Sequence, residues 1–275
     1  MNLRTITTRF AVAGVSTAVA AGALVAAGTG AATAASASGS YDCSAAGNAL
    51  GAFPFKMDVP LLPPTAPAGM PIAAGLLSYT SELDAPAATA GGLLGLLKVD
   101  GGHSDDFAMK VGSATIAAPT AYKVGTATDT AVPFTGTGAN SAFSLPKAGT
   151  YNVTLPSQFT VVPTSGGTDL PYVITCVTSA PGALGKVTLS KQVSTTAGKA
   201  SKVRTGYKLV STVKNEYSTA TGKVVAKLGT KSWTKTLSKG KAVFALPKSA
   251  KGKKVTLSYK GDGYTAGSKS AVRVK

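Results

Sequence analysis

Phe53-Pro54-Phe55-Lys56-Met57-Asp58-Val59 places an apolar side chain at every second position, with Lys56 and Asp58 on the other side. This alternation predicts a strand with one face in a core and one in solvent. Similar short runs, separated by Pro- and Gly-containing turns, recur from Tyr41 to Val177. About eight to ten such strands favour an all-β sandwich. One segment, Gly92 to Leu97, fits either a short helical turn or a buried strand.

Residues 1–37 have the composition of a secretory signal peptide. A positively charged start precedes an apolar, alanine-rich run, and small-x-small cleavage patterns end at Ala34 and at Ala37. The alternative is an uncleaved membrane anchor, but the run is only weakly hydrophobic and no second hydrophobic span follows. We therefore expect cleavage between Ala34 and Ala37, a mature chain without a membrane span, and a secreted or extracellular location.

The only two cysteines, Cys43 and Cys176, bracket the strand-rich region. Two cysteines in an exported chain usually pair. A reactive thiol would need a base or a metal nearby, and nothing places the single histidine, His103, near either cysteine. We predict a disulfide that joins the first and last strands of a sandwich domain spanning residues 38–178.

The composition changes after a Pro-Gly linker, assigned to residues 179–184. Residues 183–275 contain 21 Lys and Arg against two acids, whereas residues 36–182 contain five Lys against nine acids, so the net charge of +17 belongs to the second part. Apolar residues alternate with lysines there, as in Lys254-Val255-Thr256-Leu257-Ser258-Tyr259-Lys260. This pattern predicts a second sandwich, Ig-like, over residues 185–275, with lysines pointing outward.

The first region resembles a secreted actinobacterial β-domain family of unknown function. The matching features are Tyr41-Asp42-Cys43 after the leader, a proline-rich early stretch, the Leu145-Pro146-Lys147-Ala148-Gly149-Thr150 turn, and a closing strand ending at Cys176. The resemblance covers about residues 41–177 and implies export and a fold, not a reaction.

The second region resembles the bacterial Ig-like repeat family of secreted and surface proteins. The matching stretches are Thr221-Gly222-Lys223-Val224, residues 237–246 and residues 255–264, which contain a Tyr-x-Gly-Asp turn. The resemblance covers about residues 183–275 and implies a spacer, stalk or adhesive unit.

The sequence offers few candidates for catalysis. Asp100-Gly101-Gly102-His103-Ser104-Asp105-Asp106 is a dense polar cluster, but it lacks calcium-loop spacing and the several His or Cys ligands of zinc. We interpret it as a solvated turn. Glu82 and Asp84 form a close acidic pair without any sign of a cleft. A nucleophile elbow and a phosphate-binding glycine loop are both missing from the sequence, so we predict no catalytic residue, metal or cofactor, and no enzyme activity.

Lysine-rich outward positions are the strongest functional signal. The candidate polyanion-binding residues are Lys202, Arg204, Lys208, Lys223, Lys227, Lys254, Lys260 and Arg273. Lysine is a cation with little geometric selectivity, which favours nonspecific attraction to a polyanion. Trp233, between Lys231 and Lys235, is interpreted as a core anchor rather than a sugar-stacking residue.

These features predict a secreted, non-catalytic envelope protein. Its expected partners are anionic cell-wall polymers or acidic polysaccharide, held without a covalent bond, and not a specific nucleic acid. The Ig-like unit would provide the electrostatic contact or act as a spacer or adhesion module. The alternatives are a surface that only keeps the protein soluble, a secreted enzyme acting on wall or extracellular polymer, and a protein–protein adhesin.

Overall fold

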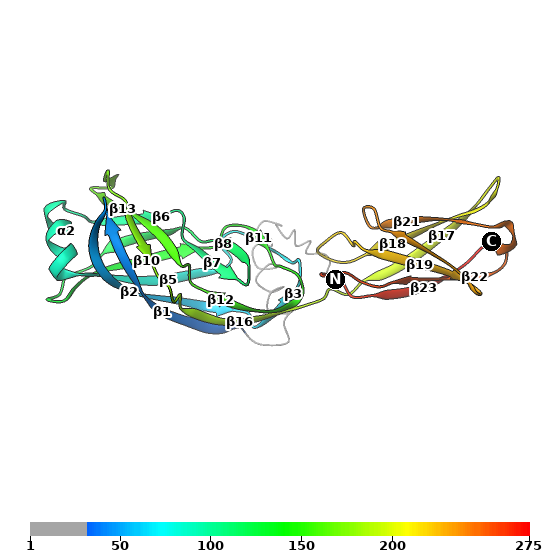
Figure 1. Cartoon of the computed structure of the whole chain (residues 1–275), viewed down its shortest axis with the longest axis horizontal. Coiled ribbons are helices and arrows are strands. Elements are labelled where there is room, and N and C mark those ends of the chain that lie inside the picture. Colours follow the sequence, from blue (N-terminus) through cyan, green and yellow to red (C-terminus); the bar gives the residue numbers. More distant parts are fainter. Residues whose placement is uncertain (1–31) are drawn as a thin grey trace, which may run out of the picture.

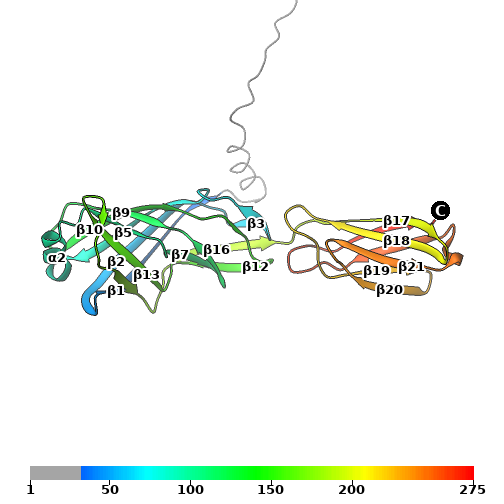
Figure 2. The same ribbon diagram turned by 90° about the horizontal axis from the view of Figure 1, so that it is seen from above.

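A computed structural model describes residues 32–275, apart from the side chains of Thr89 and Leu93. The chain forms two units that lie end to end (Figures 1 and 2). Both consist almost entirely of strands, which confirms the predicted all-β fold. The helical elements are η1 (Ala87–Gly91), α2 (Gly92–Leu96) and η2 (Lys248–Ala250). Across residues 32–275 we find no helix long and apolar enough to cross a membrane.

The first unit is organised around a sheet that closes on itself. Eight of its nine strands follow one another around a ring, because β13 pairs with β15 on one side and with β6 on the other. In ring order the strands are β13 (Gln158–Ser165), β15 (Ile174–Val177), β1 (Thr33–Ala45), β2 (Asn48–Leu62), β5 (Ser78–Pro86), β10 (Ala131–Ala139), β9 (Thr120–Val124) and β6 (Gly101–Ser104). The ninth, β14 (Thr168–Asp169), pairs with the end of β13.

A second layer covers the part of the ring nearer the second unit (Figure 1). Its sheet contains, in order, β3 (Thr65–Pro67), β16 (Ala183–Ser190), β12 (Gly149–Thr154), β7 (Ala108–Val111) and β8 (Ala114–Ala117). A small sheet of β4 (Pro71–Ile72) and β11 (Phe143–Ser144) completes the unit. The core between the layers is continuous with the core of the ring.

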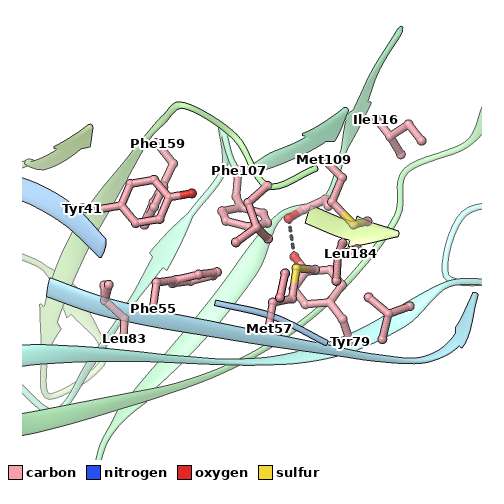
Figure 3. Close-up of a cluster of buried hydrophobic side chains, with 14 of the residues drawn as sticks. Tyr41, Phe55, Met57, Tyr79, Leu83, Phe107, Met109, Ile116, Phe159 and Leu184 are labelled. Atoms are coloured by element: carbon pink, nitrogen blue, oxygen red, sulfur yellow. Dashed lines mark hydrogen bonds between the residues drawn. The ribbon is translucent and has the colours of Figure 1, made fainter. Parts of the chain in front are cut away.

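Aromatic side chains fill the middle of the ring (Figure 3). Phe159 packs edge-on against Tyr41 and Phe107, with ring centroids 4.9 and 5.3 Å apart. Phe55 joins the same cluster from β2, where alternation places it inward and Lys56 outward, as predicted. The Tyr41 hydroxyl donates a hydrogen bond of 2.7 Å to the Pro156 carbonyl, which satisfies its buried polar atom.

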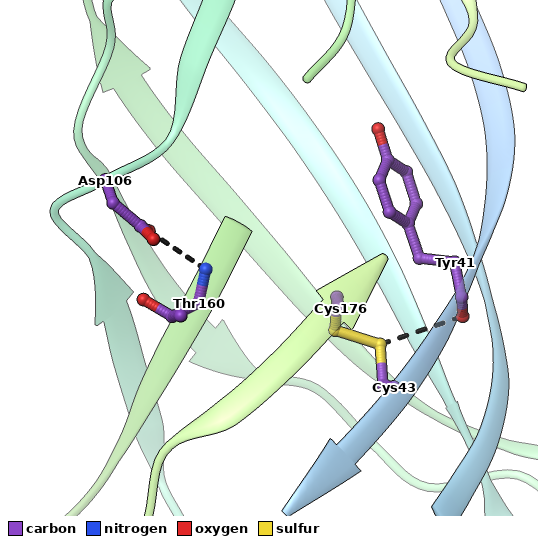
Figure 4. Close-up of a disulfide and its surroundings, with 5 residues drawn as sticks. All are labelled: Tyr41, Cys43, Asp106, Thr160 and Cys176. Carbon is purple, nitrogen blue, oxygen red and sulfur yellow. Dashed lines mark hydrogen bonds between the residues drawn. A yellow bond between two sulfur atoms is a disulfide. The ribbon is translucent and has the colours of Figure 1, made fainter. Parts of the chain in front are cut away.

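The predicted disulfide is present, but β15 is not the last strand of the first unit, because β16 follows it. Cys43 of β1 and Cys176 of β15 lie directly opposite each other in the sheet, with Cα atoms 4.1 Å apart, and they are bonded (Figure 4). Both side chains are buried. The bond therefore links two strands that are 133 residues apart in sequence.

The second unit is an Ig-like sandwich of seven strands. One sheet has the order β17-β18-β21 and the other β20-β19-β22-β23. The chain therefore crosses from one sheet to the other after β18, β20 and β21, as in Ig-like folds. The bounds are β17 (Thr195–Val203), β18 (Gly206–Lys214), β19 (Lys223–Leu228), β20 (Lys231–Thr236), β21 (Lys241–Leu246), β22 (Lys254–Tyr259) and β23 (Ser268–Arg273). Its core is separate from that of the first unit.

The predicted boundary between the units is wrong by several residues. The segment assigned as a linker, 179–184, runs into β16, which pairs with β12 and buries Leu184, Val187 and Leu189 in the first core. Gly182 is packed rather than flexible, since a Cβ there would lie 2.4 Å from the Ser38 carbonyl oxygen. The crossing between the units comes at residues 191–194.

The start of the first unit also differs from the predicted position at residue 38. Thr33 to Ala37 belong to β1 and pair with β2, and the Ala37 side chain is buried opposite Met57. The predicted signal peptide otherwise falls outside the described residues. Cleavage after Ala34 would leave the Ala37–Met57 pair in place, whereas cleavage after Ala37 would remove it.

Candidate functional site

Four of the eight predicted polyanion-binding residues share one face of the second unit. Because directly paired residues of antiparallel strands point the same way, the pairs Lys227–Thr256 and Lys254–Arg273 place three cations on the outer face of the sheet β20-β19-β22-β23. Alternation along β19 and β23 adds Lys223 and Lys269 to the same face. We call this set the basic face: Lys223, Lys227, Lys254, Lys269 and Arg273, all exposed.

The other four predicted residues lie elsewhere. Lys202, Arg204 and Lys208 belong to the β17–β18 hairpin of the opposite sheet, and Lys260 follows the end of β22. All four are exposed. Lys269 was missed, because the inward positions of β23 are Ser268, Ser270 and Val272, and a single large apolar residue gives a weak strand pattern. Three further lysines, Lys199, Lys214 and Lys241, join Lys208 on the outside of the sheet β17-β18-β21.

Like charges face each other directly on the basic face. Lys254 and Arg273 are cross-strand partners, and such a pair is destabilising unless an anion lies nearby. The Arg273 Nε donates to the Gly252 carbonyl at 3.1 Å, which fixes the guanidinium beside the lysine. The ion pairs recorded between residues 32 and 275, Lys56–Asp58 and His103 with Asp105 and Asp169, all lie in the first unit.

One of the two acidic residues of the second unit has a structural role. The Asp262 carboxylate accepts hydrogen bonds from the Thr221 hydroxyl at 2.7 Å and from the backbone N–H groups of Thr221, Tyr264 and Thr265 at 2.8–2.9 Å. Burial acts to raise its pKa, but the four hydrogen bonds outweigh burial and lower the pKa to about 2. Gly261 precedes it with φ +86°, so the Tyr-x-Gly-Asp turn needs both its glycine and its aspartate.

Replacing Asp262 with asparagine should destabilise the second unit by about 1–3 kcal/mol, because the amide nitrogen cannot accept the bonds from Thr221. The pKa is lower in the folded state, so the carboxylate stabilises the fold above the unfolded-state value of about 4, and this contribution is lost as pH falls towards 2. Unfolding followed by fluorescence of Trp233, the chain's one tryptophan, should show this pH dependence in the wild type and much less in Asp262→Asn. Equal slopes in both proteins would contradict the assignment.

A buried amide joins the two units. Gln192, 4% exposed, donates from Nε2 to the Ala68 carbonyl at 2.5 Å and accepts at Oε1 from the Tyr217 N–H at 2.9 Å. A second contact runs from the Ala148 N–H to the Gly263 carbonyl at 2.9 Å. Tyr217 and the neighbouring Tyr264 also pack against the first core, so the units meet through a specific joint.

The polar cluster at residues 100–106 is not the solvated turn that the sequence predicted, because Gly101–Ser104 form the ring strand β6 and three of these four residues are buried. Its carboxylates support the local backbone. Asp100 accepts from the Gly166 N–H at 2.7 Å, and Asp106 accepts from the Thr160 N–H at 2.9 Å (Figure 4). His103 contacts Asp105 and Asp169 at the surface, 3.2 and 3.3 Å away. Within residues 32–275, we find no group of three or more His, Cys, Asp or Glu side chains placed to hold a metal ion.

The acidic pair and the tryptophan occupy ordinary structural positions. Glu82 is exposed on β5 opposite Lys56 of β2, on the outside of the ring, and Asp84 lies on the same side of the strand. Trp233 is half-buried on the edge strand β20 and packs against the second core, as the core-anchor interpretation predicts.

A cavity of about 200 Å³ lies inside the ring at the end covered by α2. Ring residues such as Phe53, Phe134 and Ile174 form its walls, and Ala90 and Leu94 close it from the helical segment. Polar side chains among its described lining residues are limited to Asn48 and Tyr172. Sequence patterns do not reveal such a cavity, since its residues come from separate strands.

No protein-family model matches the chain, and no curated protein or solved structure is significantly similar to it. Both family resemblances therefore remain predictions, and function has to be inferred from the chain's own residues.

Proposed function

We propose that the protein is a secreted, non-catalytic envelope protein whose Ig-like unit binds anionic polymers of the cell wall or acidic polysaccharide through the basic face. The observation that carries the proposal is the direct pairing of Lys254 with Arg273 among five exposed cations. The like charges of Lys254 and Arg273 repel each other in the free protein, and a polyanion lying over them would stabilise this pair.

The chemistry of the face fits a repeating anion better than a defined small ligand. Four of its five cations are lysines, which attract negative charge without requiring a fixed geometry. The cations are spread over three strands, β19, β22 and β23, rather than gathered in a pocket. The predicted signal peptide implies an extracellular location, and the disulfide agrees with that location. A protein outside the cell would meet anionic wall polymers.

Retention in the wall fraction should fall steeply with salt. Between about 0.1 and about 1 M salt the Debye length falls from about 10 to about 3 Å, so exposed charges lose most of their attraction. Washing isolated cell walls at both concentrations and measuring the released protein checks this. Binding of the purified protein to immobilised polyphosphate, a chemically defined polyanion, should show the same salt dependence. If neither surface retains the protein at low salt, the proposal is wrong.

A further inference from the structure

We propose that the cavity under α2 binds a small uncharged apolar molecule, or the apolar end of a larger one, about the size of a single aromatic ring. The cavity lies in the first unit and the basic face in the second, so this inference does not depend on the proposed polyanion binding.

The lining determines the chemical class of the ligand. A buried water needs about two to four polar partners, and the interior walls offer apolar groups such as Phe53, Leu94 and Phe134 instead. Water is therefore a poor occupant. An engineered apolar cavity of about 150 Å³ stays dry and binds benzene, and the present cavity of about 200 Å³ is of similar size.

Small side chains create the space. Ala45, Ala85 and Ala90 all line the cavity, and Ala85 and Ala90 are almost completely buried. Protein interiors normally pack without such voids, and a larger apolar residue at any of these positions would reduce the space. Closed sheets of eight strands either fill their interior with side chains or hold one small ligand. The middle of this ring is filled by aromatic residues (Figure 3). The cavity lies at its outer end.

The cover of the cavity is a short helical segment rather than a strand. It consists of five residues of π-helix followed by five of α-helix, and its sequence from Ala87 to Leu97 carries no charged residue. Pro86 gives its first turn no side-chain cap. Its ends are held by backbone bonds such as Ala87 N–H to the Thr130 carbonyl and Val99 N–H to the Leu94 carbonyl, both 3.0 Å. Short helices of this kind open at low cost compared with sheet.

Apolar side chains are exposed at the same end of the ring. Leu96 is 79% exposed beside the lining residue Leu97, and Tyr172, itself a lining residue, is 43% exposed. Val173 is 49% exposed next to it. An apolar ligand approaching this end would therefore meet an apolar surface before it reaches the cavity.

Toluene is a suitable probe. In the full-length protein, calorimetry with toluene in excess over its Kd should raise the Tm of the first unit by about 2–4 °C. Methyl NMR signals of Leu94, Leu97 and Ile174 should shift, while those of Leu209 and Leu257 in the second core should not. The substitution Ala90→Phe fills the cavity and should abolish both effects. The matched control Ala88→Phe, on the exposed side of the same segment, should retain them.

Three outcomes would overturn the inference. The first is a wild-type protein whose Tm and Leu94 signals do not respond to toluene. The second is an equal response in the wild type and Ala90→Phe, which would place toluene elsewhere. The third is a shift confined to the second core. If Ala90→Phe does not fold, Leu94→Phe replaces it, and the wild-type NMR experiment remains decisive. Comparing toluene with 1-hexanol then separates a ring-shaped from a chain-shaped ligand.

Discussion

Replacing Cys43 and Cys176 with alanine should lower the free energy of unfolding of the first unit by about 2–5 kcal/mol. The bond closes a loop with a sequence separation of 133 residues, for which the loop-entropy model gives about 5 kcal/mol. Both sulfurs are buried between β1 and β15, so some packing is lost as well. Denaturant unfolding followed by far-UV circular dichroism measures the change.

Reductant separates the cross-link from the packing of the sulfur atoms. Equilibrium unfolding of the wild type should shift to lower denaturant when dithiothreitol is present, whereas the double alanine variant should not respond. The single variant Cys43→Ala loses the cross-link and one sulfur, and should approach the double variant in stability. A wild type that unfolds at the same denaturant concentration with and without reductant would show that the bond contributes little.

Replacing Lys227, Lys254 and Arg273 with glutamine in one triple variant should weaken polyphosphate binding roughly a hundredfold. A lysine or arginine near an anionic surface contributes about 1 kcal/mol, so three contribute about 3 kcal/mol. The same change should leave the second unit equally stable or stabilise it by about 0.2–1 kcal/mol, because the like-charged pair is removed. Binding at fixed low salt and the unfolding midpoint by Trp233 fluorescence measure the two effects.

The matched control neutralises three lysines on the opposite sheet, Lys199, Lys208 and Lys241. It changes the net charge by the same amount, so it tests whether position matters beyond total charge. If the basic face is the binding site, the control variant should lose clearly less affinity than the triple variant of the basic face. An equal loss in both triple variants would mean that the whole second unit attracts polyanions and that no particular face does so.

Local patterns in the sequence predict strands well but not their partners. Alternation at residues 53–59 correctly placed Phe55 in the core and Lys56 outside. Pairing of β13 with β6, which closes the ring, joins residues about 60 apart and leaves no periodic trace in either strand. The Gly92–Leu97 segment was ambiguous because its small and apolar residues suit both states; it is helical through Leu96 and covers the end of the ring.

The unit boundary was misplaced for a related reason. Pro181-Gly182 has the composition of a linker, yet Gly182 is required for close approach to the backbone of β1. The actual crossing contains Gln192, whose burial depends on contacts with both units. Among the candidate site residues, alternation predicted that lysines point outward, but only strand order reveals that Lys227, Lys254 and Arg273 share a sheet.

The joint at Gln192 has a mechanical consequence. Because its amide is bonded to the backbone of both units, a bend at the crossing would break buried hydrogen bonds, and the molecule should tumble as a stiff rod. The far tips carry α2 at one end and the C-terminus at the other (Figure 1). If the protein is bound to a surface along its C-terminal half, the stiff joint would make the opposite tip, which carries α2, project away from that surface.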